Sequence, residues 1–415
     1  MTDPVSLQIA GHHVTITHPD KVVFPADHER PGLNPRTKLD LINYYLSVAG
    51  GALRGVADRP MILKRFVKGI AAEAVFQKRA PANRPDWVDV VELRYASGRS
   101  AAEAVIHDAA GLAWAINLGC VDLNPHPVRR TDIDHPDELR VDLDPMPGVA
   151  WQQIVDVALV TREVLEDHGL VAWPKTSGSR GFHVYARIAP HWPFNQVRMA
   201  AQTVAREVER RIPEAATSRW WKEEREGVFV DFNQNAKDRT VASAYSVRAG
   251  PDARVSTPLY WYEVDDCDPA AFTMATVPAR FAEMGDPWAA MDAAVGRLDQ
   301  LLMLAEELGP PQPAPTSRAR AGETRNRRQS TMPLIEIARA KTRAEAMAAL
   351  DTWRGRYPAA ADCLRPADVL VDSMRGPSSI WYRIRINLRH VPVDQRPPQE
   401  ELIADYSPWI KPESR

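Results

Sequence analysis

Two aspartates near the middle of the chain have the spacing of metal ligands. The segment 139–144, LRVDLD, alternates as a β-strand does, so Asp142 and Asp144 share one face and the apolar residues share the other. Same-face neighbours on a strand lie about 6.6–6.8 Å apart, and two carboxylates at this spacing can converge on hard cations. A solvated acidic pair next to a turn is the competing interpretation, and this segment alone leaves both open.

A third aspartate, Asp231, stands in the apolar segment VFVDFN, which predicts a strand over 228–232. A lone buried carboxylate is costly unless it is paired or bound to a metal. Three aspartates from two strands are typical of a two-metal phosphoryl-transfer site, and their oxygen atoms favour Mg²⁺ or Mn²⁺. The sequence therefore predicts a site for two Mn²⁺ or Mg²⁺ ions.

A glycine-containing segment, KTSGSRGFHVY (175–185), lies between the acidic strands and has the features of a phosphate-binding turn. Glycines let backbone amides approach an anion, while Ser177, Arg180 and His183 add polar side chains. Arg248, at the end of an apolar run that we expect to be β-prone, is a further candidate for the same anion. The competing interpretations are an ordinary glycine turn with a satisfied histidine, and a solvated arginine. Neither GxxxxGK[ST] nor GxGxxG occurs in the chain.

The elements that must position these residues alternate between helices and strands. Thr37 and Asp40 form a capping-box pattern at the start of a helix predicted to reach about residue 49. The apolar spacing predicts further helices over 151–168, 195–211 and 345–353, and strands over 139–144, 182–186 and 228–232. The segment SSIWYRIRINLRH, near the C-terminus, alternates like a strand.

The length of 415 residues allows two or three domains, and three regions are predicted. Residues 1–300 form a catalytic domain, 301–332 a linker rich in proline and then arginine, and 333–415 a C-terminal extension. The linker arginines either contact a phosphate backbone or belong to a solvated tether. Trp381 and Tyr382 either stack on bases or dock the extension, and docking is the favoured interpretation.

Composition excludes several classes of protein. Hydrophobic residues make up 45% of the chain and charged residues 26%, as in globular proteins. There is no apolar run of membrane-spanning length and no secretory signal, so we expect no membrane contact. Three widely separated cysteines form no metal motif or disulfide framework, which fits a cytoplasmic location. With a net charge of −2, a nucleic acid would have to bind local basic patches.

Taken together, DLDP, KTSGSRGFHVY and VDFNQNAKDRTVASAYSVRAGPDARVSTPL resemble the polymerase domain of bacterial ATP-dependent DNA ligase D and its stand-alone relatives, which belong to the archaeo-eukaryotic primase superfamily. The upstream segments THPDKVVFP, RPMILKRFVKG and VFQKRAP match the same family in order, so the resemblance covers about residues 10–290. It implies an α+β fold, with an RRM-like antiparallel palm sheet, flanking helices and a second sheet, followed here by a small C-terminal extension.

The resemblance also implies roles for individual residues. The metal ligands and catalytic residues are Asp142, Asp144 and Asp231. The nucleotide-binding residues are Lys64, Phe76, Ser177, Arg180, His183 and Arg248. Lys21 and Lys38 match a contact with a DNA 5′-phosphate. The chain departs from the family in having Arg180 where a lysine is usual, Val75 where a second phenylalanine is common, and a longer segment between Lys21 and Lys38.

The predicted function is that of a primase-polymerase, which adds NTPs or dNTPs to a DNA 3′-hydroxyl with a preference for ribonucleotides. Gap filling or end processing in break or excision repair is the expected task, on gapped or primer-template DNA with a 5′-phosphate. No KxDG motif occurs, so a separate DNA ligase and an end-binding protein are expected partners of a monomeric, nucleoid-associated protein.

Two other functions stay open from the sequence. One is a non-catalytic module that binds DNA ends. The other is a DxD phosphohydrolase, although Met146 stands where the DxDx[TV] pattern of such enzymes has threonine or valine.

Overall fold

The computed structural model describes residues 3–26, 34–95, 98–310, 330–375 and 380–409. The chain divides into two compact units. Unit 1 comprises residues 1–144, 151–218 and 230–309; unit 2 comprises residues 145–150, 219–229 and 310–415. Most of the predicted linker lies outside the described residues, but its first residues, 301–307, belong to helix α7 (Asp299–Glu307).

The first part of unit 1 combines three helices with small antiparallel sheets. Its elements are β1 (Val5–Ile9), β2 (His12–Ile16), β3 (Val22–Phe24), β4 (Arg36–Thr37), α1 (Lys38–Ser47), α2 (Ala49–Val56), β5 (Arg59–Arg65), β6 (Val75–Gln77), β7 (Asp89–Arg94), β8 (Ser100–Ile106), α3 (Ala109–Asn117) and β9 (Asn124–Pro125). One sheet has the order β6-β5-β8-β7, with β9 paired to β5. The predicted capping box is confirmed, because Thr37 and Asp40 exchange side-chain and backbone hydrogen bonds at the start of α1.

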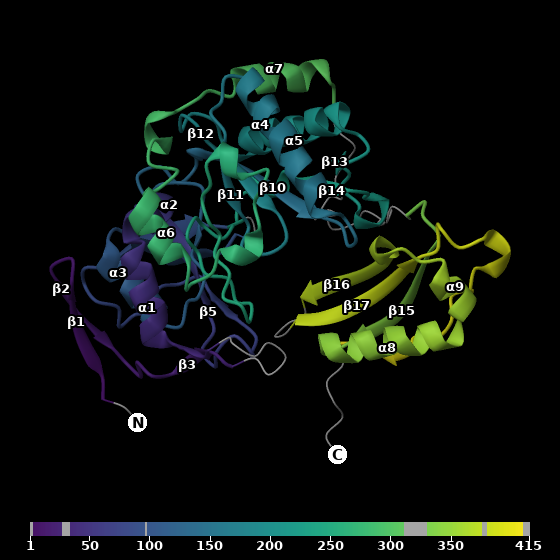
Figure 1. Cartoon of the computed structure of the whole chain (residues 1–415), viewed down its shortest axis with the longest axis horizontal. Helices are drawn as coiled ribbons and strands as arrows, with labels where there is room; N and C mark the ends of the chain where they lie inside the picture. The colour runs from purple at the N-terminus through teal and green to yellow at the C-terminus, as the bar shows by residue number, and fades with distance from the viewer. Residues whose placement is uncertain (1–2, 27–33, 96–97, 311–329, 376–379, 410–415) are drawn as a thin grey trace. The chain divides into compact units, whose positions relative to one another are not determined.

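The second part of unit 1 contains the sheet that bears the acidic segments. Its elements are β10 (Glu138–Pro145), α4 (Trp151–Asp167), β11 (Trp173–Thr176), β12 (Phe182–Arg187), α5 (Phe194–Arg211), β13 (Ala216–Thr217), β14 (Val228–Asp231), α6 (Val277–Met284) and α7. The strand order is β11-β12-β10-β14-β13, and β12 is antiparallel to both β10 and β11. Helices α4 and α5 pack against each other and against this sheet (Figure 1).

The alternation predicted for β10 is confirmed. Leu139, Val141 and Leu143 are almost completely buried, whereas Asp142 is partly buried and Asp144 is exposed. Arg140, on the same face as Asp142, is nevertheless buried, because its guanidinium donates to the Glu138 carboxylate. The face that bears the aspartates is therefore polar without being fully solvated.

The predicted helices α4 and α5 and the predicted strands β12 and β14 are confirmed within one residue at each end. The apolar run before Arg248 was expected to be β-prone, but it forms no regular strand. Only Val247 makes a bridge, to Val255, because residues 241–246 fold as a turn and loop.

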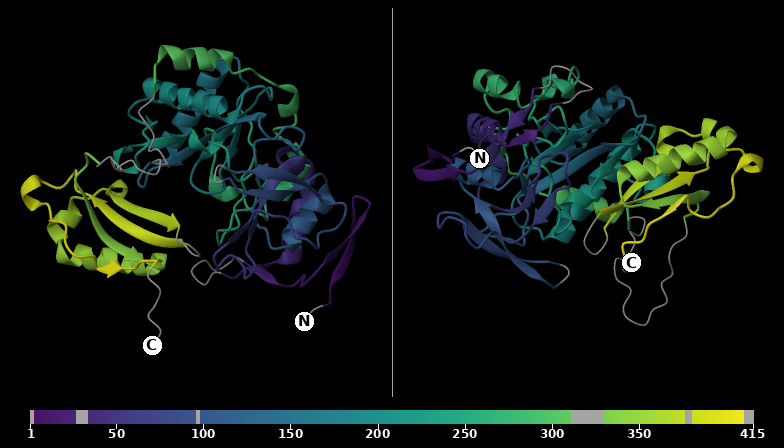
Figure 2. Two further views of the ribbon diagram at one scale, coloured as in Figure 1. Left: turned by 180° about the vertical axis from the view of Figure 1, so that it is seen from behind. Right: turned by 90° about the horizontal axis from the view of Figure 1, so that it is seen from below.

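Unit 2 contains a four-stranded sheet with a helix along one face (Figures 1 and 2). Its elements are β15 (Leu334–Ala340), α8 (Arg343–Arg356), α9 (Pro358–Asp362), β16 (Val369–Arg375), β17 (Ile380–Asn387) and β18 (Ala404–Asp405), and the strand order is β16-β17-β15-β18. Apolar side chains of α8, β15 and β17 form the core. The predicted helix and strand of this region are confirmed.

The segment 219–229 joins unit 2 through polar contacts. Lys222 donates to the carbonyl of Val371, and the buried Asn387 amide donates to the carbonyl of Glu223, with distances of 3.0 and 3.1 Å. Arg389 forms an ion pair with Glu226 at 2.8 Å. These contacts account for the grouping of 219–229 with the C-terminal residues.

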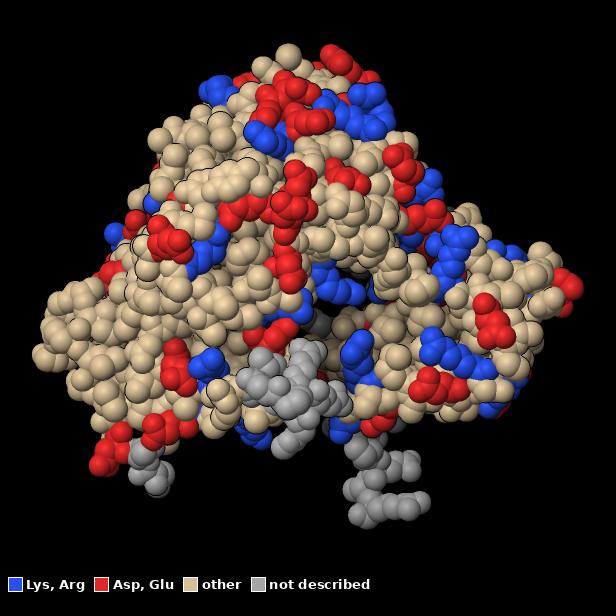
Figure 3. All heavy atoms as spheres, viewed as in Figure 1, with Lys and Arg blue, Asp and Glu red and all other residues tan. Residues whose placement is uncertain are grey.

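Acidic and basic side chains are interspersed on the face visible in Figure 3, as the small net charge suggests. Within the described ranges, no helix combines the length and the apolar character that a bilayer crossing requires.

Candidate active site

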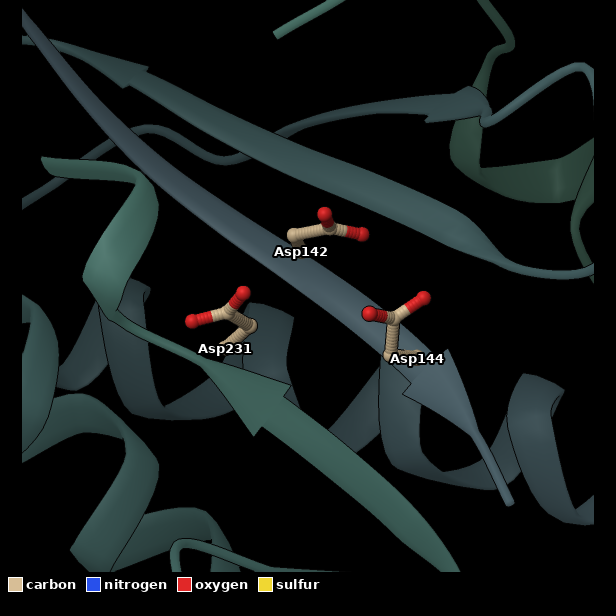
Figure 4. Close-up of side chains that lie close together, drawn as sticks. All are labelled: Asp142, Asp144 and Asp231. Carbon is tan, nitrogen blue, oxygen red and sulfur yellow. The ribbon is translucent and has the colours of Figure 1, made fainter. Parts of the chain in front are cut away.

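The three predicted metal ligands converge. Asp142 and Asp144 lie along β10, and Asp231 lies at the end of the neighbouring β14 (Figure 4). One oxygen atom of each carboxylate lies within 4.8 Å of the corresponding atoms of the other two. Adjacent strands thus bring residues about ninety positions apart in the sequence to one point.

The surroundings of Asp142 and Asp231 favour the neutral forms of their carboxyl groups. Burial raises the pKa of Asp142 to about 6, against the opposing charges of Lys175 and Arg248. Burial also raises the pKa of Asp231 to about 6, and the negative charge of Asp142 adds to this effect. Asp231 accepts hydrogen bonds from the Asn233 amide and the Gln234 side chain, both at 2.8 Å, which hold its orientation.

The donor set suits a hard divalent cation. Three carboxylates converge here, and burial raises the pKa of two of them, Asp142 and Asp231. A cation among them relieves both the mutual repulsion and the cost of burial. The residues present therefore fit the predicted cofactor in chemistry, and this chemistry does not distinguish Mn²⁺ from Mg²⁺.

A cleft of about 300 Å³ opens beside the aspartates. It brings together all the residues predicted to bind the nucleotide, which are Lys64, Phe76, Ser177, Arg180, His183 and Arg248, along with Asp142 and Asp144. These residues come from β5, β6, β12 and the loops around residues 180 and 248, so the grouping depends on the fold of the whole unit.

The glycine turn is organised from within by Ser177. Its hydroxyl oxygen accepts the amides of Ser179 and Gly181, each at 3.1 Å. Gly178 has a φ of +66°, and a Cβ atom there would lie 2.5 Å from Cγ of Arg248 and 2.9 Å from the Ser256 nitrogen. Glycine is required at 178 for both reasons, and the turn brings Arg248 against the backbone.

A basic and an aromatic side chain, Lys64 and Phe76, also line the cleft. Lys64 on β5 forms an ion pair with Asp122 at 2.8 Å, and Phe76 on β6 is its partner in the strand register. Half of the surface of Phe76 is exposed to the solvent.

Lys21 and Lys38 lie at a different cavity of about 510 Å³. Lys38 is almost fully buried and donates to the carbonyl oxygen atoms of Thr17 and Asn117, while Lys21 donates to the carbonyl of Val67. Burial and the charge of Lys21 lower the pKa of Lys38 to about 8. The structure thus pairs these two lysines and separates them from the aspartate cleft.

Two polar residues of the cleft, Asp122 and Gln234, were not predicted from the sequence, and neither was the buried Lys175. Asp122 could have been suspected as a carboxylate in an apolar run. Lys175 gave no such signal, because only the strand register places it opposite His183.

Comparison with known proteins extends these observations. Residues 37–288 match the family model described as LigD, primase-polymerase domain. The chain is 32% identical over 330 residues to a multifunctional non-homologous end joining protein LigD of Mycobacterium bovis, covering 75% of this chain and 41% of that protein. The LigD protein of Pseudomonas aeruginosa is 28% identical over 281 residues, covering 66% of this chain and 32% of that protein. The chain thus spans less than half the length of either relative.

A solved structure has a similar fold. The polymerase domain of Mycobacterium tuberculosis ligase D, in complex with DNA, superposes with a TM-score of 0.61 and 33% identity, covering 68% of this chain and 98% of that domain. The mixed α+β fold with antiparallel sheets agrees with that domain. The family model covers more than half of the chain and includes all three converging aspartates. The chain therefore belongs to the LigD primase-polymerase domain family, a family of DNA and RNA nucleotidyltransferases.

Proposed function

We propose that the protein is a metal-dependent, DNA-directed primase-polymerase that adds NTPs or dNTPs to a DNA 3′-hydroxyl during break or excision repair. The observation that carries the proposal is the convergence of Asp142, Asp144 and Asp231 beside a cleft with three basic side chains. The names of the relatives support a role of this protein in non-homologous end joining.

We infer that the sheet β11-β12-β10-β14 is an RRM-like palm. Its elements follow the chain order β10, α4, β11, β12, α5, β14, which is a βαββαβ unit, and the first and third strands lie at the centre of the sheet. This arrangement supports the inference because it puts β10 next to β14, and so places the two acidic segments side by side.

The chain's own residues have separable roles in this mechanism. Asp142, Asp144 and Asp231 would hold two Mn²⁺ or Mg²⁺ ions, which when bound activate the attacking hydroxyl and neutralise the leaving pyrophosphate. Asn233 and Gln234 fix the orientation of Asp231. The remaining contribution of the protein is to position the substrates and to provide complementary charge.

The nucleotide is assigned to the cleft. Arg180, Arg248 and Lys64 offer positive charge to a triphosphate. Ser177 and His183 line the same cleft. The half-exposed Phe76 ring is proposed to stack on the base. Base–aromatic stacking is worth about 1–3 kcal/mol and tolerates any base. A preference for ribonucleotides is part of the proposal, and a comparison of NTP with dNTP incorporation tests it.

The second cavity is assigned to DNA. Lys21 and Lys38 converge there with Arg65, and this concentration of positive charge suits a 5′-phosphate at a gap. Gapped DNA is therefore the proposed substrate. We propose a DNA ligase and an end-binding protein as partners, because the relatives are named as non-homologous end joining proteins.

Primer extension on gapped, 5′-phosphorylated DNA tests the proposal, with NTP compared with dNTP and Mn²⁺ with Mg²⁺. We expect Asp142→Ala and Asp231→Ala to abolish extension and leave DNA binding largely unchanged, because each removes a carboxylate from the three-aspartate site. Asp134→Ala is the matched control, since this exposed aspartate forms an ion pair with Lys237.

Extension by Asp142→Ala at the wild-type rate would contradict the assignment of the site. DNA binding by the wild-type protein without any incorporation would favour the end-binding module. Release of inorganic phosphate from a monoester, with no pyrophosphate from NTP, would favour the phosphohydrolase.

A further inference from the structure

A buried lysine lies behind the candidate metal site. Lys175, on β11, has no exposed surface, and in the described part of the chain no carboxylate lies within 4.0 Å of its ammonium group. Its Nζ donates to the carbonyl of Ala242 at 3.0 Å and to the hydroxyl of Ser256, and it lies 2.7 Å from Nδ1 of His183. Burial and the charge of Arg248 lower the pKa of Lys175, so its cationic form depends on the acceptors that surround it.

The strand register places this lysine in line with a metal ligand. His183 on β12 is the partner of both Lys175 on β11 and Asp142 on β10. The three side chains therefore form a row across three strands. The imidazole stands between the other two, with Nε2 3.3 Å from an Asp142 carboxylate oxygen.

The hydrogen bonds around Lys175 determine the position of the imidazole proton. The Ser256 hydroxyl donates to the carbonyl of Thr176 at 2.8 Å, so toward Lys175 it acts as an acceptor. A carbonyl, a hydroxyl oxygen and Nδ1 of His183 are then three acceptors for the three donors of an ammonium group. Because Nδ1 of His183 accepts, the proton of the neutral ring is on Nε2.

The other tautomer of His183, with its proton on Nδ1, is unfavourable. A neutral amine has only two N–H groups for the three acceptors around it. If its lone pair instead accepted from an Nδ1–H group of His183, the Nε2 lone pair would face the carboxylate of Asp142. An ionised Asp142, as a metal ligand requires, is repelled by that lone pair and attracted by an N–H group. The same N–H also suits the predicted contact between His183 and a phosphate oxygen.

We propose that Lys175 is a positioning residue of the candidate metal site, which fixes His183 as the Nε2–H tautomer and so presents an N–H group, rather than a lone pair, to the carboxylate of Asp142. The proposal rests on the proposed function for its catalytic meaning. Partners that orient a metal ligand in this way commonly change metal affinity or activity by about 10–100-fold when they are removed.

The first test measures the tautomer. In the wild-type protein, ¹⁵N NMR of the histidine rings, with His183 assigned by its loss in His183→Phe, should show a proton on Nε2 and none on Nδ1. A ring protonated on Nδ1 would overturn the proposal, and this measurement needs neither DNA nor nucleotide.

The second test uses Lys175→Met, which keeps the length of the side chain and removes its donors. We expect the dissociation constant for Mn²⁺ and the Mn²⁺ concentration for half-maximal extension to rise about 10–100-fold, with DNA binding unchanged. Lys175→Gln keeps N–H donors and should recover part of the affinity if it folds where the methionine variant does not. Lys237→Met, at a half-exposed lysine paired with Asp134, is the control.

A double variant separates positioning from general destabilisation. If Lys175 acts through His183, Lys175→Met combined with His183→Phe should bind Mn²⁺ no more weakly than His183→Phe alone. Additive losses would overturn the proposal, as would unchanged Mn²⁺ affinity in Lys175→Met. A wild-type protein that neither binds Mn²⁺ nor extends DNA would instead refute the proposed function, while the NMR result would still decide the tautomer.

Discussion

At the scale of residues, the site contains carboxyl groups whose charged forms are disfavoured by burial. Asp142 and Asp231 are partly buried, and their pKa values are raised to about 6 mainly for that reason. In the folded protein without a cation, both carboxyl groups therefore bind protons more tightly than in the unfolded chain. Their contribution to the free energy of unfolding is favourable at low pH and is lost as the pH rises through about 6.

Divalent cations compete with these protons, which gives a pH-dependent prediction. Addition of Mn²⁺ should raise the melting temperature strongly at pH 7.5 and little at pH 5. The apparent Mn²⁺ affinity should fall about tenfold per pH unit below 6 for each proton displaced. Thermal unfolding with and without Mn²⁺ between pH 5 and 8 measures this. Stabilisation by Mn²⁺ that does not vary with pH would contradict the raised pKa values.

At the scale of elements, the turn between β11 and β12 controls the shape of the cleft. Ser177 closes the turn from inside, and Gly178 allows the backbone to pass against Arg248 and the chain at Ser256. Strand pairing on both sides fixes the ends of the turn, since Thr176 is paired with Phe182. The position of Arg248, which is not on a strand, therefore depends on this turn.

Gly178→Ala should disturb that position. The new Cβ would meet Arg248 and the backbone, and the left-handed φ adds strain of about 1–3 kcal/mol. We expect a several-fold rise in KM for the nucleotide. Gly11→Ala is the matched control, because Gly11 has a similar φ of +83° and a Cβ atom there would meet nothing within 4 Å. Equal effects of the two substitutions on KM in extension assays would argue against a role of this turn.

At the scale of the whole molecule, unit 2 is more than the C-terminal residues. It takes in the segments 145–150 and 219–229, which follow β10 and lead into β14. The arginines of β17 and the following loop are used within this unit, since Arg383 and Arg385 bind Asp372 and Arg389 binds Asp368 and Glu226. All of these ion pairs join residues of unit 2 to one another.

Asn387→Ala should loosen unit 2 around the segment 219–229. The Asn387 side chain is buried and donates to the carbonyl of Glu223, so its loss should lower the free energy of unfolding by about 1–3 kcal/mol. Limited proteolysis should then cut 219–229 faster than in the wild type. Arg356→Ala, at an exposed ion pair with Glu400 in the same unit, is the control. It should change neither the free energy of unfolding nor the rate of cleavage. Unchanged proteolysis in Asn387→Ala would show that the segment is held by other contacts.

The sequence by itself predicted the local elements and the types of residue at the site. The capping box of Thr37, the alternation of β10 and the apolar setting of Asp231 depend on neighbours within a few positions, and these predictions are confirmed. The resemblance in motif order was sufficient to identify the family. The linker's start and the irregular run before Arg248 were less predictable, because packing on other elements decides where a helix or strand ends.

Only the tertiary structure decided which distant groups meet. Asp231 joins the other aspartates because β14 lies next to β10, and Lys175 reaches His183 because of the register of β11 with β12. Strand order and register depend on packing across the whole unit, which no local pattern encodes. Burial likewise sets the raised pKa values of Asp142 and Asp231, since the cost of a charge depends on everything packed around it.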